Sequence, residues 1–158
     1  MNETKKLRVA LFFGGVSSEH EVSCVSASTW LRALAQAPCA DRYEVFPVGI
    51  TKQGRWLACS PTPEAMADGS WEKGADCTPC VLSPDRTDHG IWLLKDGKAE
   101  LVHIDICAPV MHGKNGEDGT IQGLFELARI PYVGCGVLGS AVCMDKAVAN
   151  TIMDAAGV

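Results

Sequence analysis

The chain has 158 residues, of which 47% are hydrophobic and 21% are charged, a composition that is ordinary for a globular domain. Its formal net charge of −5 argues against nucleic acid as the main partner. No apolar run is long enough to cross a bilayer, and the apolar segment at 7–13 runs into Gly14 and Gly15 without a signal-peptide cleavage site. We therefore expect a cytoplasmic protein that binds neither nucleic acid nor a membrane.

The eight cysteines favour reduced thiols over disulfides or a metal site. Most of them stand in apolar or helical segments, where cysteine behaves as a small hydrophobic residue. Only Cys77 and Cys80, in "CTPC", have the spacing of metal ligands, and no second pair follows to complete a zinc site. A metal or redox role for this pair is the alternative, and we expect no bound metal.

Apolar patterns predict strands and helices that alternate along the chain. Segment 7–13 is a nearly unbroken apolar run, typical of a strand buried on both faces of a sheet. Asp96-Gly97 between two apolar runs is a hairpin signal, whereas 72–90 is expected to be rich in loops. The predicted strands are 7–13, 43–50, 54–59, the hairpin 91–104, 104–111 and 131–136, and the predicted helices are 18–37, 63–69, 120–130 and 145–158. This alternation predicts an α/β fold with a mainly parallel open sheet flanked by helices.

Capping signals locate the ends of two of these helices. Ser18 followed by Glu21 matches the capping box S-x-x-E, which predicts a helix start at Ser18 and assigns the Glu21 carboxylate to the cap. Asp145 is the predicted N-cap of the last helix, and Gly157 is its stop signal. The chain ends one residue after Gly157, and because a domain would normally pack something after such a helix, we expect a truncated chain.

Two glycine-rich segments, 14–21 and 112–119, each follow a predicted strand. Ligands in open α/β sheets bind beyond the carboxyl ends of the strands, so both segments are candidates for one crevice. Glu19 lies about 200° round a helix from Glu21 and so does not compete for the same cap. Its carboxylate suits an ammonium ligand, and the alternative is that it only complements the helix dipole.

The second segment, "HGKNGEDG", combines backbone freedom with several ionisable groups. His112 ends a buried strand, so we expect its imidazole at the mouth of the crevice, either as a ligand-binding group or as a structural hydrogen-bonding group. Glu117 and Asp118 do not fit the spacing of a calcium loop, and their alternative role is to fix the loop by accepting backbone N–H bonds. The glycines that fit tight turns are Gly113, Gly116 and Gly119.

Residues 134–139, "GCGVLG", match the dinucleotide-binding pattern G-x-G-x-x-G literally. That pattern belongs in the first strand–helix unit, with an acidic residue about 20 positions further on. This copy lies near the end of the chain instead. A nucleotide-dependent oxidoreductase is the function class that it would support, and we reject that interpretation.

Three motifs resemble the D-alanine–D-alanine ligase family. "HGKNGEDGTIQG" (112–123) fits the family signature H-G-x-x-G-E-D-G at every fixed position, and "GGVSSEHEVS" (14–23) is similar to its first-loop motif. "YVGCGVLGSAVCMDK" (132–146) is similar to the opening of its ATP-grasp region. "PVGITKQGRW" and "APVMHGKNGEDG" also resemble the vancomycin-resistance branch, whose members join D-alanine to D-serine or D-lactate. The resemblance implies a Rossmann-like pre-ATP-grasp domain at 1–131 and the beginning of a central ATP-grasp domain at 132–158.

The resemblance implies part of an ATP-dependent ligase of peptidoglycan precursor synthesis, homodimeric at full length. In such enzymes ATP phosphorylates the carboxylate of the first D-alanine, the amine of the second D-alanine attacks the acyl phosphate, and phosphate leaves. The residue matching Glu19 binds the ammonium of the first D-alanine. It implies catalytic roles for Glu19 and His112 and an ATP-phosphate contact for Lys146, with Mg²⁺ or Mn²⁺ bound by regions outside this chain. The implied substrate-binding residues are Gly14, Gly15, Glu19, Val22, His112 and Gly113. A stand-alone module that binds an amino acid without catalysis is the alternative.

Overall fold

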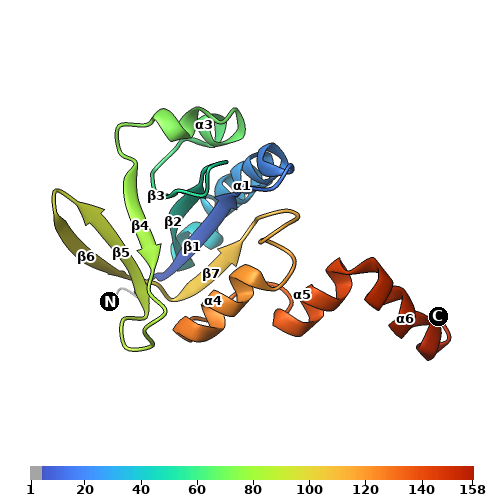
Figure 1. Ribbon diagram of the computed structural model, residues 1–158. Helices are drawn as coiled ribbons and strands as arrows, with labels where there is room; N and C mark the ends of the chain where they lie inside the picture. Colours follow the sequence, from blue (N-terminus) through green and yellow to red (C-terminus); the bar gives the residue numbers. More distant parts are fainter. Residues whose placement is uncertain (1–4) are drawn as a thin grey trace.

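The computed structural model describes residues 5–158, which form a seven-stranded sheet with helices on both faces (Figure 1). The strand order is β6-β5-β4-β3-β2-β1-β7. The strands are β1 (Leu7–Gly14), β2 (Tyr43–Ile50), β3 (Trp56–Ala58), β4 (Thr78–Leu82), β5 (Gly90–Lys95), β6 (Lys98–His103) and β7 (Ile106–Pro109). The helices are α1 (His20–Leu34), α2 (Cys39–Arg42), α3 (Pro63–Ala67), the 3₁₀ turn η1 (Ser70–Lys73), α4 (Thr120–Ala128), α5 (Val137–Met144) and α6 (Lys146–Ala156).

The α/β class and the helix-flanked open sheet are confirmed, but the sheet is mixed rather than mainly parallel. Strand β1 pairs in parallel with β2 and β7, whereas each pair from β2 through to β6 is antiparallel. Parallel neighbours need a long crossover connection, and α1 provides one between β1 and β2. The short connection Asp96-Gly97 allows only antiparallel pairing of β5 and β6, whereas the antiparallel pair of β3 and β4 is joined by the longer segment that carries α3 and η1.

Strand β1 lies in the centre of the core, which explains its unbroken apolar run. Its alternate side chains enter two different clusters, one on each face of the sheet. Phe12 packs against Phe125 of α4, with ring centroids 5.2 Å apart. Phe13 faces the other side, where Ala27 of α1 and Trp71 of η1 cover it. Both helices that follow the candidate loops are therefore anchored to the same strand.

Helix α1 does not begin with the predicted capping box. It starts at His20, and the residue at its N-cap position is Glu19, whose side chain makes no cap hydrogen bond. The Glu21 side chain instead pairs with Lys52 in the turn between β2 and β3. The prediction was wrong because a cation 31 residues away competes for the Glu21 carboxylate, and local sequence does not reveal that partner.

Two further local predictions differ from the structure. Segment 72–90 contains β4, which pairs with β3 and β5, so it is not only loop. Segment 131–136 makes no strand beyond an isolated bridge between Tyr132 and Cys107 in the described chain. Both differences arise because strand formation depends on partners distant in sequence.

Helices α5 and α6 lead away from the sheet toward the C-terminus (Figure 1). The predicted cap of the last helix is confirmed, since the Asp145 carboxylate accepts hydrogen bonds from the N–H groups of Ala147 and Val148. Gly157 ends α6 in the left-handed conformation, as predicted. None of the residues of α6 is buried, and Leu138 of α5 is 77% exposed. Among residues 5–158 no helix combines the length and apolarity needed to cross a membrane.

Candidate amino-acid site

The two glycine-rich segments meet at the carboxyl ends of neighbouring strands. β1 and β7 are adjacent and parallel, so the loops that leave them emerge at the same edge of the sheet. The chain passes from β1 to α1 on one face and from β7 to α4 on the other. This arrangement is a topological switch point, the position where open α/β sheets bind ligands.

Hydrogen bonds join the two loops directly. The Ser17 hydroxyl donates to the carbonyl of His112 (2.8 Å) and accepts from the N–H of Glu19 (2.9 Å). The Glu19 carboxylate lies over Gly113, where its Oε2 would be 2.5 Å from an added Cβ. The structure thus brings together Glu19, His112 and Gly113, although 93 residues separate the first two in the sequence.

The buried Ser23 on α1 bonds to both strand ends at the same junction. The Ser23 hydroxyl accepts from the N–H of Gly14 (2.8 Å) and donates to the carbonyl of Val110 (2.5 Å). It therefore connects the ends of β1 and β7 to α1 with one side chain. Sequence reasoning missed Ser23, because a serine in an amphipathic helix carries no local sign of such a role.

Gly14 and Gly15 adopt positive φ angles of 82° and 102°, as their predicted role in a tight turn requires. The Gly15 N–H donates to the carbonyl of Ile50 (2.8 Å), which closes the turn against β2. On its other side, the buried His20 ring places Nδ1 2.7 Å from the Gly15 carbonyl oxygen. His20 was not among the predicted site residues.

The His112 imidazole is half-buried and has a polar group beside each nitrogen. Nε2 lies 3.0 Å from the Ser26 hydroxyl, and Nδ1 lies 3.7 Å from Oε1 of Glu117. The other oxygen of Glu117 accepts from the Gly113 N–H (2.6 Å). Val22, one turn before Ser26 on α1, is 53% exposed and lies on the same side of the helix.

The remaining groups of the second loop fix its own backbone. The Asp118 carboxylate accepts from the N–H groups of Asn115 (2.9 Å) and Thr120 (3.0 Å). Partial burial opposes the charged form of Asp118, but these hydrogen bonds outweigh it and hold its pKa below the usual range. Gln122 donates to the Gly116 carbonyl (2.8 Å). Asp118 thus has the loop-fixing role that the sequence offered as an alternative.

Three other predicted positions lie apart from this junction. Lys146 is the first residue of α6, which packs mainly on α5 rather than on the sheet. Cys77 donates to the Trp71 carbonyl (3.2 Å) and packs with the α1-side core, whereas Cys80 belongs to the cluster on the opposite face. The two thiols of "CTPC" therefore serve different core clusters.

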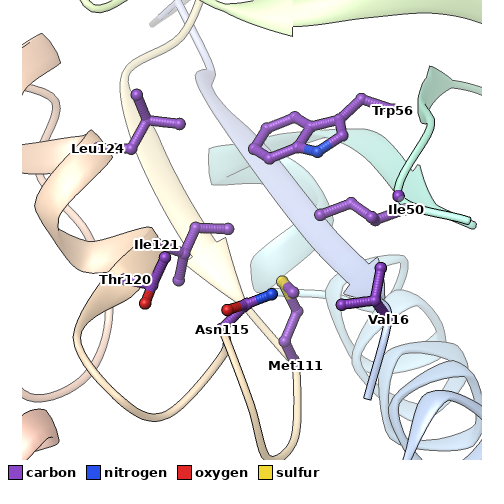
Figure 2. A pocket seen from close by; sticks show the side chains of 10 residues that line it. Val16, Ile50, Trp56, Met111, Asn115, Thr120, Ile121 and Leu124 are labelled. Carbon is purple, nitrogen blue, oxygen red and sulfur yellow. The ribbon is translucent and has the colours of Figure 1, made fainter. Parts of the chain in front are cut away.

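An apolar cavity of about 320 Å³ lies on the α4 side of the same loops (Figure 2). Val16, Ile50 and Trp56 form one wall, and α4 forms the other, with Met111 and Asn115 between them. Ten residues line it, namely Gly15, Val16, Ile50, Gly54, Trp56, Met111, Asn115, Thr120, Ile121 and Leu124. The cavity borders the back of the Gly15 turn, while Glu19 and His112 belong to the α1 side.

The fold and this junction define an α/β domain in which two glycine-rich loops meet at the carboxyl ends of neighbouring parallel strands. Residues 8–135 match the family model described as D-ala D-ala ligase N-terminus. The chain belongs to this family. It is 50% identical over 147 residues to a D-alanine–D-alanine ligase of Caldicellulosiruptor bescii, covering 93% of this chain and 38% of that protein.

Two further relatives are named as a vancomycin resistance protein and as a D-Ala:D-Ser ligase. The chain is 45% identical over 154 residues to the vancomycin B-type resistance protein VanB of Enterococcus faecalis, covering 97% of this chain and 42% of VanB. The crystal structure of the VanG D-Ala:D-Ser ligase from the same species matches with a TM-score of 0.88 and 37% identity, over 98% of this chain and 43% of that one. The chain therefore spans well under half the length of these relatives.

Proposed function

We propose that this chain is the N-terminal part of an ATP-dependent D-alanine–D-alanine-type ligase of peptidoglycan precursor synthesis, and that it binds the first D-alanine. The observation that carries the proposal is the position of the Glu19 carboxylate over Gly113, beside His112. Membership of the ligase family supports the reaction class. The alternative is a module that holds an amino acid without catalysis.

Glu19 is the best candidate for the ammonium group. Its side chain is exposed, and within residues 5–158 its carboxylate has neither a hydrogen-bond donor nor a cation beside it. Glu21, the nearest carboxylate in sequence, is already paired with Lys52. An uncompensated carboxylate in a crevice attracts a small cation, and a primary ammonium also donates hydrogen bonds to it.

The other site residues complete a place for a small zwitterion. Gly14, Gly15 and Gly113 let a ligand approach the backbone, since a side chain on Gly113 would occupy the space of Glu19. We assign the methyl group of D-alanine to Val22, whose exposed side chain lies one turn from Ser26. We assign His112 to the same subsite, and we give catalytic roles to Glu19 and His112.

Lys146 is the one residue of this chain to which we assign a contact with ATP. Lys146 is the first residue of α6, and within residues 5–158 no three His, Cys, Asp or Glu side chains are placed to hold a metal ion. That contact is with an ATP phosphate, and the ligase also needs groups that bind the rest of ATP and Mg²⁺ or Mn²⁺. We assign those groups to regions of the ligase outside this chain.

The proposal includes a domain division and partners. We propose a pre-ATP-grasp domain at 1–131 and the start of a central ATP-grasp domain at 132–158, which the absence of buried residues in α6 supports. Relatives named as D-alanine–D-lactate and D-Ala:D-Ser ligases leave D-alanine, D-serine and D-lactate as candidate second substrates. We propose a cytoplasmic homodimer for the full-length protein.

The proposal is tested by titrating the 158-residue chain with D-alanine and following backbone amide shifts by NMR. We expect shifts at Glu19 and Gly113, and none with N-acetyl-D-alanine, which lacks the ammonium group. Equal binding of both compounds would contradict the assignment of Glu19.

A second measurement separates the ligase from the binding module. The 158-residue chain alone should release no phosphate from ATP in the presence of D-alanine, and turnover above the blank would contradict the proposal. A reading frame that continues past Val158 into a magnesium-binding E-x-N motif supports the ligase. A stop codon directly after Val158 would support the module.

A further inference from the structure

We infer that Ser26 is a positioning residue for His112: its hydroxyl donates to Nε2 and holds the neutral imidazole in the tautomer that carries its proton on Nδ1. This places the Nδ1–H toward the Glu117 carboxylate. The positioning of His112 by Ser26 is argued from the contacts of the ring alone. Its consequence for the substrate rests on the proposed function.

The Ser26 hydroxyl differs from its neighbours on α1 in where it bonds. Ser28 and Thr29 both donate to the carbonyl of Val25, which is the usual choice for hydroxyl side chains inside a helix. Ser26 instead bonds across to His112, 86 residues away, at 3.0 Å. This hydroxyl is therefore directed at the ring rather than at its own helix.

The two sides of the imidazole require different hydrogen-bonding roles. In a neutral imidazole one nitrogen donates and the other accepts. Oε1 of Glu117 lies 3.7 Å from Nδ1, and a carboxylate can only stabilise a proton there, because it has nothing to donate. Nε2 is then the acceptor, and the serine hydroxyl, which can donate, completes the pair.

Each partner of the ring is itself held in place. Oε2 of Glu117 accepts from the Gly113 N–H at 2.6 Å, so the carboxylate is fixed by the backbone of the same loop. Ser26 stands on α1, which Ser23 ties to the ends of β1 and β7. Because Ser26 bonds Nε2 and the Glu117 carboxylate faces Nδ1 at 3.7 Å, the ring has an oriented environment before any ligand binds.

One side of α1 carries three residues that act on the candidate subsite. Glu19, Val22 and Ser26 follow one another at intervals of three and four residues, so they share one side of the helix. Glu19 and Val22 would touch the amino acid, whereas Ser26 would act through His112. Loss of the hydroxyl should leave the first two in place and free the ring to rotate and to exchange its tautomers.

The tautomer is measured directly by ¹⁵N–¹H correlation of the imidazole groups in the 158-residue chain, at a pH where the rings are neutral. His112 is identified by the signal that a His112→Gln variant lacks. We expect the Nδ1-protonated pattern in the parent chain, a mixture of tautomers in Ser26→Ala, and the parent pattern again in Ser26→Thr. An Nε2-protonated ring in the parent, or no change in Ser26→Ala, would overturn the inference.

The consequence for the substrate is measured in the full-length protein. Ser26→Ala should raise the KM for the first D-alanine by roughly three- to tenfold, the effect of one hydrogen bond, with the KM for ATP unchanged. Ser26→Thr should restore the parent value, and Thr29→Ala serves as the control, since it removes only a bond within the helix.

The two measurements test different parts of the inference. A changed tautomer with an unchanged KM for D-alanine would overturn the substrate part of the inference. If the full-length parent made no dipeptide or depsipeptide at all, the proposed function would fail, while the tautomer measurement would still decide the role of Ser26.

Discussion

Oε2 of Glu19 lies 2.5 Å from the position that a Cβ on Gly113 would occupy. The absence of a side chain at Gly113 is therefore what allows the Glu19 carboxylate to reach over the second loop. The two residues come from loops that follow different strands, and Ser17 bonds those loops together at the same place. Glycine at 113 and glutamate at 19 form one complementary contact.

Gly113→Ala should disturb the Glu19 carboxylate as well as the backbone. Gly113 has a φ of 71°, so alanine there costs about 1–2 kcal/mol of stability from the left-handed conformation alone. Gly69→Ala is the matched control, because Gly69 has a φ of 80° with no atom within 4 Å of the added Cβ. Urea unfolding and D-alanine titration measure both effects. If both variants bind D-alanine equally well, the contact between Glu19 and Gly113 does not matter for the ligand.

Ser23→Ala should destabilise the fold by about 1–3 kcal/mol, because it leaves two buried backbone groups, the Gly14 N–H and the Val110 carbonyl, without their partner. Thr29→Ala on the exposed side of the same helix should cost well under half as much. Urea unfolding of the two variants gives the comparison. Equal destabilisation would mean that the Ser23 bridge is not what holds β1 and β7 to α1.

The thiols should divide into a fast and a slow class toward iodoacetamide. Burial raises the pKa of Cys80 to about 12 and that of Cys24 to about 11, which leaves almost no thiolate at neutral pH. Cys135 and Cys143 are exposed and should react first. Mass spectrometry of a labelling time course, with the urea-unfolded chain as a control that labels all eight cysteines, tests this order. Early labelling of Cys80 would contradict the packing described for β4.

The ionised Asp105 carboxylate should stabilise the fold only at pH values above its folded-state pKa. The N–H of Arg8, which donates to its carboxylate at 2.7 Å, holds the pKa of Asp105 below its ordinary value of 3.8, and His103 adds to this effect. A lowered folded-state pKa means that the stabilisation is present above 3.8 and is lost as the pH falls through the folded-state pKa. Asp105→Asn should therefore lower the urea midpoint at neutral pH and converge with the parent in acid. A constant difference at every pH would contradict this assignment.

Much of the candidate site could be predicted from the sequence because its strongest signals are local. Glu19 and His112 each follow a glycine-containing turn or a buried strand, and both strands proved to be parallel neighbours. The partner of Glu21 could not be predicted, because Lys52 approaches it only through the packing of β2 against α1. Ser23 and Ser26 were missed for the same reason, since Val110 and His112, to which their hydroxyls bond, are distant in the sequence.

The strands also differ in whether their own sequence or a distant partner determines them. β1 was predicted from its apolar run, because burial on both faces leaves a pattern in the strand itself. β4 was not, because this five-residue strand owes its conformation to pairing with β3 and β5 rather than to an apolar pattern of its own. The mixed character of the sheet follows from these antiparallel pairings rather than from the alternation of strands and helices.

The most direct test of the account compares Glu19→Gln with Glu21→Gln in the full-length ligase, measuring kcat/KM for the first D-alanine and the KM for ATP. Glutamine keeps the shape of Glu19 and removes its charge, and a hydrogen bond to a charged group contributes about 1.5–3 kcal/mol, so kcat/KM should fall roughly ten- to a hundredfold. Glu21→Gln breaks only an exposed ion pair with Lys52, so it should change kcat/KM for the first D-alanine less than twofold. Equal defects in the two variants, or a Glu19→Gln defect that falls mainly on the KM for ATP, would contradict the binding of the substrate ammonium by Glu19.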